Sequence, residues 1–325
     1  MLLTPKRRML ARAYAATALA VSLAALTGCA GGQQQPSAAG ASAKASTGKG
    51  SSSAAAPAPV QASSGTTAKD PSSAAAPAPV QASSGAPLAA APRTGGVSGD
   101  TKVTIHGTGL DSVQRVRFGS ASVVPSGRSA TRLTVTAPAA KGFAAATVPV
   151  ALVRATGSSA VGSYHYVVRS GLDKQLNYLL KYWKHYNPAY EPLDDNDCVD
   201  FTSQSLLRRG WNEQGAWTHA AAVLDSGLAW RSSTALRDFL GSHPELATPL
   251  TDDQRAKVKL GDIVQFDWDR SGDRDHTGVV TRIVHSTSGI KIYFAGHTKD
   301  SAYRSVDTAI TKDHPGGVAT YWSVK

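Results

Sequence analysis

Residues 30–91 consist almost entirely of Ala, Ser, Gly, Pro and Gln, with hardly a large apolar side chain among them. Such a segment has too little apolar surface to offset the entropy lost on folding, so we expect it to be disordered. Within it the string SSAAAPAPVQASSG occurs at 52–65 and again at 72–85. Each copy carries a single Val and no hydrophobic face, so the duplication predicts a tether rather than a solenoid. Folded domains are therefore expected only after residue 91.

The N-terminal segment has the order of features typical of an export signal. Basic residues come first, an Ala- and Leu-rich stretch too short for an ordinary membrane span follows, and LTGC ends the segment at 26–29. LTGC resembles a bacterial lipobox, which implies cleavage after residue 28 and a lipid on Cys29. The segment therefore predicts a protein anchored by lipid on the extracellular face of the cell membrane. An uncleaved anchor or an ordinary signal peptide remains an alternative, and Arg7-Arg8 leaves the choice between Sec and Tat export open.

The positive charge of the chain is concentrated beside the predicted anchor. Residues 30–170 carry twelve Lys or Arg against three Asp or Glu, whereas residues 171–325 carry eighteen against twenty. A basic region near a membrane favours attraction to anionic lipid or wall polymer. These charges are not interleaved with aromatic side chains, so we expect no nucleic-acid partner.

Residues 92–169 predict a small all-β domain. KVTIH, RLTVT and VPVALV alternate apolar and polar residues, and Gly, Ser and Pro separate these runs, which favours an antiparallel sandwich. The stretch GDTKVTIHGTGLDSVQRVRFGSASV and the closing GSYHYVV resemble an IPT/TIG immunoglobulin-like domain. The resemblance implies a spacer or a binding module.

Two helices are expected at the start of the region 170–325. SGLDKQLNYLLKYWKHY has apolar residues at helical spacing, and Ser170 with Asp173 fits a capping box. DDNDCVDFTSQSLLRRG fits one complete helix with acids in its first turn, arginines in its last turn and Gly210 after its end. This places Cys198, the only cysteine after Cys29, in the first turn, where the helix dipole favours thiolate. The same position also suits an inert, buried thiol.

Two histidines follow on successive predicted strands. KVKLGDIVQFDW predicts a strand, His276 begins the next strand in HTGVVTRIV, and His297 ends a third in GIKIYFAGHT. A cysteine at a helix N-terminus and two strand histidines can together form a site in which one imidazole takes the thiol proton. Spacing in the sequence does not show that the three side chains meet.

NDCVDFTSQ, GDIVQF, HTGVV and FAGHT, in this order, resemble the amidase domain of the papain-like NlpC/P60 group. The resemblance covers about 170–325 and implies a papain-like α+β fold. It implies Cys198 as nucleophile, His276 as general base and then acid, and His297 as the residue that orients the base. One departure is Asp200, where the group often has Asn; a carboxylate there would raise the thiol pKa.

The predicted architecture is therefore multidomain. It comprises a lipoprotein signal peptide at 1–28, a disordered tether at 29–91, an immunoglobulin-like sandwich at 92–169 and a papain-like amidase domain at 170–325. The predicted function is that of a lipid-anchored extracellular cysteine amidase or peptidase that cleaves an amide bond. The predicted location and the family resemblance favour cell-wall peptidoglycan as the substrate. No cofactor is expected.

Several alternatives remain open at this point. Asn196 suits an oxyanion hole or an N-cap, and Asp300 could orient the base in place of His297. Cys198, His276 and His297 could instead bind zinc, although no further Cys or His lies one helical turn from Cys198. In another alternative, the chain is a surface-binding lipoprotein whose amidase-like domain is inactive.

Overall fold

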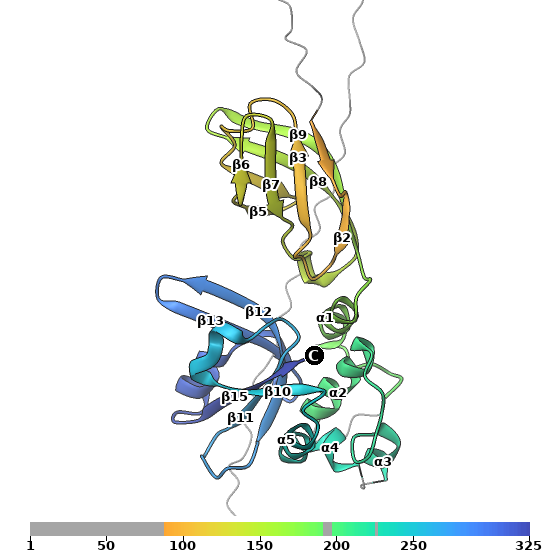
Figure 1. Ribbon diagram of the computed structural model, residues 1–325. Coiled ribbons are helices and arrows are strands. Elements are labelled where there is room, and N and C mark those ends of the chain that lie inside the picture. The colour runs from red at the N-terminus through yellow and green to blue at the C-terminus, as the bar shows by residue number, and fades with distance from the viewer. Residues whose placement is uncertain (1–87, 191–196, 225–226) are drawn as a thin grey trace, which may run out of the picture. The chain divides into compact units, whose positions relative to one another are not determined.

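The computed structural model describes residues 88–190, 197–224 and 227–325 (Figure 1). The predicted signal peptide, Cys29, residues 30–87 of the predicted tether and Asn196 lie outside the described residues. The last residues of the predicted tether are described, and Ala89–Ala91 form a strand of the following domain. Within the described ranges, every helix is too short or too polar to cross a membrane.

The first described domain is a sandwich of two sheets. One sheet has the strand order β1-β3-β7-β6 and the other the order β2-β9-β8-β4-β5. All pairs are antiparallel except β2 and β9, which run parallel. The elements are β1 (Ala89–Ala91), β2 (Thr94–Gly96), β3 (Lys102–His106), β4 (Arg115–Phe118), β5 (Ala121–Val123), β6 (Gly127–Arg128), β7 (Arg132–Thr136), η1 (Lys141–Phe143), β8 (Ala146–Arg154) and β9 (Gly157–Val167).

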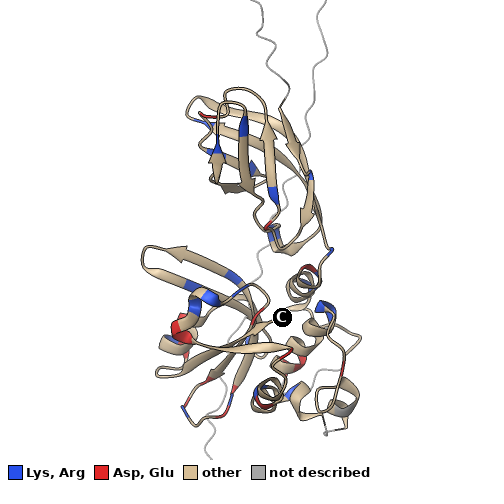
Figure 2. Cartoon of the chain, viewed as in Figure 1, with Lys and Arg blue, Asp and Glu red and all other residues tan. Residues whose placement is uncertain are grey.

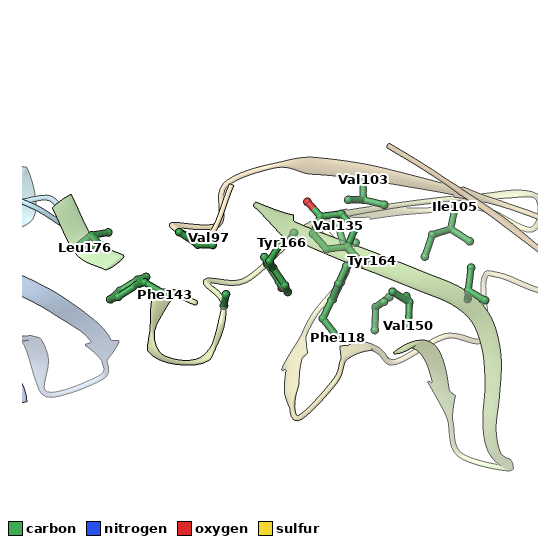
Figure 3. Close-up of a cluster of buried hydrophobic side chains, with 14 of the residues drawn as sticks. Val97, Val103, Ile105, Phe118, Val135, Phe143, Val150, Tyr164, Tyr166 and Leu176 are labelled. Atoms are coloured by element: carbon green, nitrogen blue, oxygen red, sulfur yellow. The ribbon is translucent and has the colours of Figure 1, made fainter. Parts of the chain in front are cut away.

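The alternation in the sequence decides which side chains enter the sandwich core. β3 and β7 pair with Val103 opposite Val135, so that the apolar residues of both strands are buried on one face. Phe118 and Tyr164 pack edge to face, with ring centroids 5.2 Å apart, within the same cluster (Figure 3). The β-rich immunoglobulin-like region is therefore present, as the sequence predicts.

The surface of the sandwich is predominantly basic. Residues 88–169 include nine Lys or Arg and two Asp or Glu, and blue segments outnumber red ones on its strands in Figure 2. The charge imbalance noted in the sequence thus belongs partly to a folded surface.

The C-terminal domain is α+β, with helices packed on a six-stranded sheet of order β10-β15-β11-β12-β13-β14 (Figure 1). The helical elements are α1 (Gly171–Tyr182), α2 (Asp197–Arg209), α3 (His219–Val223), α4 (Leu228–Arg231), α5 (Ser233–Ser242), η3 (Asp252–Lys257), α6 (Val306–Thr308) and η4 (Ala309–Asp313). The strands are β10 (Ala247–Thr251), β11 (Ile263–Asp267), β12 (His276–Ser286), β13 (Gly289–Gly296), β14 (Ser301–Ser305) and β15 (Val318–Val324).

Local signals in the sequence set the ends of the first two helices. Ser170 accepts a hydrogen bond from the backbone of Asp173, whose carboxylate in turn accepts from the backbone of Ser170, so the predicted capping box is confirmed. α2 ends at Arg209, and Gly210 follows with φ 114°, a conformation that favours glycine. Asp173 also accepts a hydrogen bond of 2.8 Å from the backbone of Ser98, which belongs to the loop after β2.

The two faces of the sheet pack against different partners. Ile263 and Trp322 lie in a buried cluster with residues of α2, α4 and α5, and we call this face the helix side. Val264 and Phe266 lie in another cluster with Val306 and Ala309, and we call this face the opposite side. Because side chains alternate along a strand, neighbouring residues of one strand contribute to different clusters.

Candidate functional site

Cys198 lies in the first turn of α2, as predicted, and faces the sheet from the helix side. Its side chain is buried in the cluster that contains Trp230 and Ile263. The sulfur Sγ lies 3.8 Å from Oγ of Ser233, the first residue of α5. The thiol is therefore enclosed by the packing of two helices on the sheet.

The environment of Cys198 raises the thiol pKa rather than lowering it. Burial is the dominant cause, and the negative charge of Asp197 acts in the same direction. Hydrogen bonds from the backbone of Thr277 and from Ser233 act in the other direction but do not outweigh burial. The expectation of a depressed pKa is therefore wrong for this conformation, because desolvation exceeds the effect of the helix terminus.

A network of buried, hydrogen-bonded polar side chains lies next to the sulfur on the helix side. Thr277 donates a hydrogen bond of 2.8 Å to Oγ of Ser233, and Nε2 of Gln265 donates one of 2.7 Å to the Ser233 carbonyl. Trp322 donates from Nε1 to Oε1 of Gln265 at 2.9 Å. We did not identify these residues from the sequence, although the Gln within the apolar run DIVQFDW is an available signal.

His297 lies on the helix side, immediately after β13. Nδ1 is hydrogen-bonded to Oδ2 of Asp197, and Nε2 lies 3.0 Å from the carbonyl oxygen of Tyr182. The ring is stacked between Tyr186 and Phe201, with centroid distances of 3.8 and 3.7 Å. Because both ring nitrogens face oxygen acceptors, both contacts are satisfied only when both nitrogens carry a proton. His297 and Asp197 thus form a buried, hydrogen-bonded pair next to Cys198 in the chain, and this pair is an ion pair when the imidazole carries both protons.

Asp300 does not contact this histidine pair. It is exposed and accepts a hydrogen bond of 2.9 Å from the hydroxyl of Tyr186. The carboxylate bonded to a histidine here is instead that of Asp197, which precedes Cys198 directly in the chain and contacts His297. Asp197 fitted the sequence equally well as a first-turn acid, so its pairing was not foreseen.

His276 begins β12, as predicted, but its side chain lies on the opposite side of the sheet. It pairs with Phe266 in the β11–β12 ladder and packs near Trp268 and Phe294, with centroid distances of 6.1 and 6.0 Å. Its Nε2 is buried and has no hydrogen-bond partner among the described residues. Burial, with a smaller contribution from the charge of Arg304, lowers the pKa of His276 to about 3.

The structure therefore pairs His297 with Asp197, the residue that precedes Cys198, whereas His276 lies on the other side of the sheet from the sulfur. Thr277, whose backbone contacts the sulfur, lies on the helix side, so the preceding residue points away from it. The three predicted catalytic side chains do not converge in this conformation, and a zinc site made from them is not formed. In the described part of the chain, the group whose ligand atoms could hold a metal is Asp267, Asp269 and Asp275.

Asp200 is completely buried, one turn along α2 from Asp197. It accepts hydrogen bonds from Nε1 of Trp230 and Nε2 of Gln204, and Gln204 accepts one from the hydroxyl of Tyr178. Burial raises the pKa of Asp200 to about 7, with a further contribution from the charge of Asp197. The departure from Asn at this position thus places a carboxyl group in a buried network that joins α1, α2 and α4.

Comparison with known proteins relates both domains to families. Residues 171–318 match the model described as "Putative amidase domain", and residues 89–166 match that of the IPT/TIG domain. Over 118 residues the chain is 23% identical to the uncharacterized protein YhbB of Bacillus subtilis, covering 32% of this chain and 35% of YhbB. The chain thus spans about a third of that relative.

One solved structure with similarity is the SGBP-B protein of the Bacteroides ovatus mixed-linkage glucan utilization locus, in complex with a mixed-linkage heptasaccharide. The identity is 11%, the TM-score is 0.19, and the match covers 73% of this chain and 52% of the other. At this level of similarity the match carries no argument about fold or function.

Proposed function

We propose that the C-terminal domain hydrolyses an amide bond with Cys198 as its nucleophile. The observation that carries the proposal is that Cys198 lies in the first turn of α2, against β12, within the 171–318 match to an amidase domain. A thiolate at this point would attack the amide carbonyl carbon and form a thioester as the C–N bond breaks. Water would then cleave the thioester, releasing the acid and regenerating the thiol.

The proposal assigns the proton transfers to His276. Its imidazole would accept the thiol proton and deliver it to the leaving amine. His297 is unsuited to this role, because both of its nitrogens are held by Asp197 and Tyr182. His276 has a free Nε2, but the start of β12 must turn its side chain to the helix side before it can reach the sulfur. The proposal thus requires a closed, inactive conformation and an open, active one.

The proposed substrate is a peptide or amide bond of the cell wall, reached from a lipid anchor at Cys29 on the extracellular face of the membrane. The support is the LTGC sequence, the composition of residues 30–91 and the basic surface of the sandwich. If the lipid provides most of the membrane affinity, Cys29→Ala will release the protein into the medium. Retention of this variant on membranes at high salt contradicts the anchor.

The direct test is mass spectrometry of peptidoglycan digested by the full chain and by Cys198→Ala. We expect new amine and carboxylate ends with the natural protein and their loss with the variant. Ser233→Ala is the matched control, because it changes a side chain in contact with the sulfur but leaves the nucleophile in place. Equal products from the natural protein and Cys198→Ala would exclude a cysteine mechanism.

A second candidate function is non-catalytic binding at the cell surface by an inactive amidase-like domain. The burial of Cys198, its raised pKa and the position of His276 across the sheet favour it. Alkylation distinguishes the two candidates, since a nucleophile that opens to solvent reacts with iodoacetamide at pH 6.5 faster than free cysteine. A structural thiol reacts only after unfolding.

A further inference from the structure

The loop between β11 and β12 has a regular spacing of oxygen-bearing side chains. It reads DWDRSGDRD, with Asp at 267, 269, 273 and 275, and Ser at 271. Gly272 lies at the centre of the loop with φ 94°, a conformation that favours glycine. The loop contains four carboxylates and two arginines, so its net charge is negative within a basic chain.

Three of these carboxylates converge. Asp267, Asp269 and Asp275 each offer one oxygen, and these oxygens lie within 4.8 Å of one another. Asp269 accepts a hydrogen bond of 3.0 Å from the backbone of Ser271, and Asp275 accepts one of 2.7 Å from the backbone of Trp268. These bonds fix the directions of two of the three carboxylates.

Asp267 is the buried member of the group. Its exposed fraction is 4%, and its Oδ1 has no hydrogen-bond partner among the described residues. The other oxygen, Oδ2, accepts a hydrogen bond of 3.0 Å from the backbone of Gly272 and lies 3.5 Å from the guanidinium of Arg274. A buried carboxylate oxygen needs a donor or a cation. Both of these contacts involve Oδ2, so Oδ1 of Asp267 has neither a donor nor a cation from the described residues. Asp267 is also a member of the group of three converging carboxylates.

We propose that this loop binds a calcium ion. In a calcium loop of the EF-hand type, oxygens at positions 1, 3, 5, 7 and 9 surround the ion, and glycine at position 6 makes the sharp turn. Counting from Asp267, these positions are Asp269, Ser271, the backbone carbonyl of Asp273, and Asp275, with Gly272 at position 6. Carboxylate, hydroxyl and carbonyl oxygens are ligands that suit calcium.

The proposed site is a weak one. Position 12, where an EF-hand has a bidentate Glu, is Gly278 within β12, so water must complete the coordination. The guanidinium of Arg274 also partly neutralises the negative charge of Asp267, which weakens the attraction for a cation. Both features place the dissociation constant in the range of extracellular calcium modules, about 10⁻⁴ to 10⁻³ M. The ion would connect the end of β11 to the start of β12.

Terbium luminescence tests the site directly, because Trp268 lies within the loop and can transfer excitation energy to a bound Tb³⁺ ion. We expect a sensitised signal from the full chain that calcium displaces at millimolar concentration. Asp269→Asn should weaken Tb³⁺ binding about tenfold or more, since it removes a charged ligand but keeps an acceptor for Ser271. Asp269 is exposed, so this variant should fold.

Asp273→Asn is the matched control. It removes the same charge from the same loop, but its side chain is outside the converging group. We expect a smaller loss of affinity than in Asp269→Asn. Equal losses in the two variants would show a diffuse negative charge and overturn the site, as would the absence of any Tb³⁺ signal.

Thermal unfolding gives a second measurement that does not depend on enzymatic activity. With a dissociation constant of about 10⁻⁴ M, 10 mM calcium raises the folding equilibrium constant about a hundredfold. We therefore expect Tm to rise by several degrees with calcium, less with magnesium, and by about half as much or less with calcium in Asp269→Asn. No rise with calcium overturns the proposal, and an equal rise with magnesium overturns the assignment to calcium.

Discussion

The histidines on the two faces of the six-stranded sheet differ in their hydrogen-bond partners. On the helix side, His297 is fixed through both nitrogens, one of them paired with Asp197, and lies between two aromatic rings. On the opposite side, His276 lies among aromatic rings with an unpartnered Nε2. One imidazole is thus held as part of the architecture, and the other is buried without compensation. The difference indicates that His297 has a positioning role, whereas His276 retains a nitrogen that is free to act.

The largest expected effect concerns activity. If His276 serves Cys198, then Cys198→Ala and His276→Ala should each lower kcat/KM by about 10³-fold or more. The double variant should be no worse than the worse single variant, since both residues act in one proton transfer. Hydrolysis of a wall peptide by the four proteins provides the measurement. Losses that multiply would mean that His276 does not act through the sulfur, and the contrast between the two faces would then be purely structural.

The second expected effect concerns the buried ion pair. Asp197→Asn removes the carboxylate that pairs with the His297 imidazole, and His297→Gln removes the imidazole that pairs with the Asp197 carboxylate. Each should lower the free energy of unfolding by about 3 kcal/mol. The double variant should recover part of this loss, because no uncompensated charge remains. Urea denaturation of the natural protein and the three variants measures these differences in the free energy of unfolding.

Asp300→Asn is the control for the ion pair. Asp300 is exposed and bonded only to Tyr186 among the contacts described above, so its loss should change stability by no more than about 0.5 kcal/mol. If Asp300→Asn cost as much as Asp197→Asn, our choice of Asp197 as the partner of His297 would fail.

The third expected effect is a pH dependence caused by Asp200. Its pKa in the folded protein, about 7, lies above its ordinary value of 3.8, so the folded state retains a proton that the unfolded state has lost. Stability should therefore fall as pH rises from about 4 to 7, by at most about 4 kcal/mol. Asp200→Asn carries no ionisable group here and should show a flatter profile. Urea unfolding at pH 4.5, 6 and 7.5 compares the two; parallel profiles would show that Asp200 ionises normally.

Local signals in the sequence were sufficient for much of this domain but not for the faces of its strands. Ser170, Asp173 and Gly210 set helix ends through local hydrogen bonds and backbone conformation, so α1 and α2 could be predicted. The order of β11, β12 and β13 followed from their apolar runs. However, the first six residues of β12 are all buried, because both sides of the sheet are covered. Such a strand has no alternation to show which side chain faces Cys198.

The contacts between side chains of the site could not be predicted from the sequence either. Asp197 and Asp200 both suited the first turn of a helix, and only tertiary packing separates their roles as ion-pair partner and network member. The loop at 267–275 has a readable spacing, but its significance depends on the burial of Asp267, which the sequence does not reveal.

The smallest expected effect compares two adjacent residues of β12. His276→Leu replaces a buried side chain with an unpartnered nitrogen by an apolar one of similar size, so stability should be unchanged or rise by about 1 kcal/mol. Thr277→Val should lower stability by about 1–2 kcal/mol, because Ser233 and Gln265 lose a partner on the helix side. Urea denaturation of both variants under the same conditions tests the pair. A loss in His276→Leu as large as that in Thr277→Val would show that His276 has a structural partner after all. A gain in stability combined with a loss of hydrolysis would instead show that the domain retains an unfavourable histidine for its chemistry.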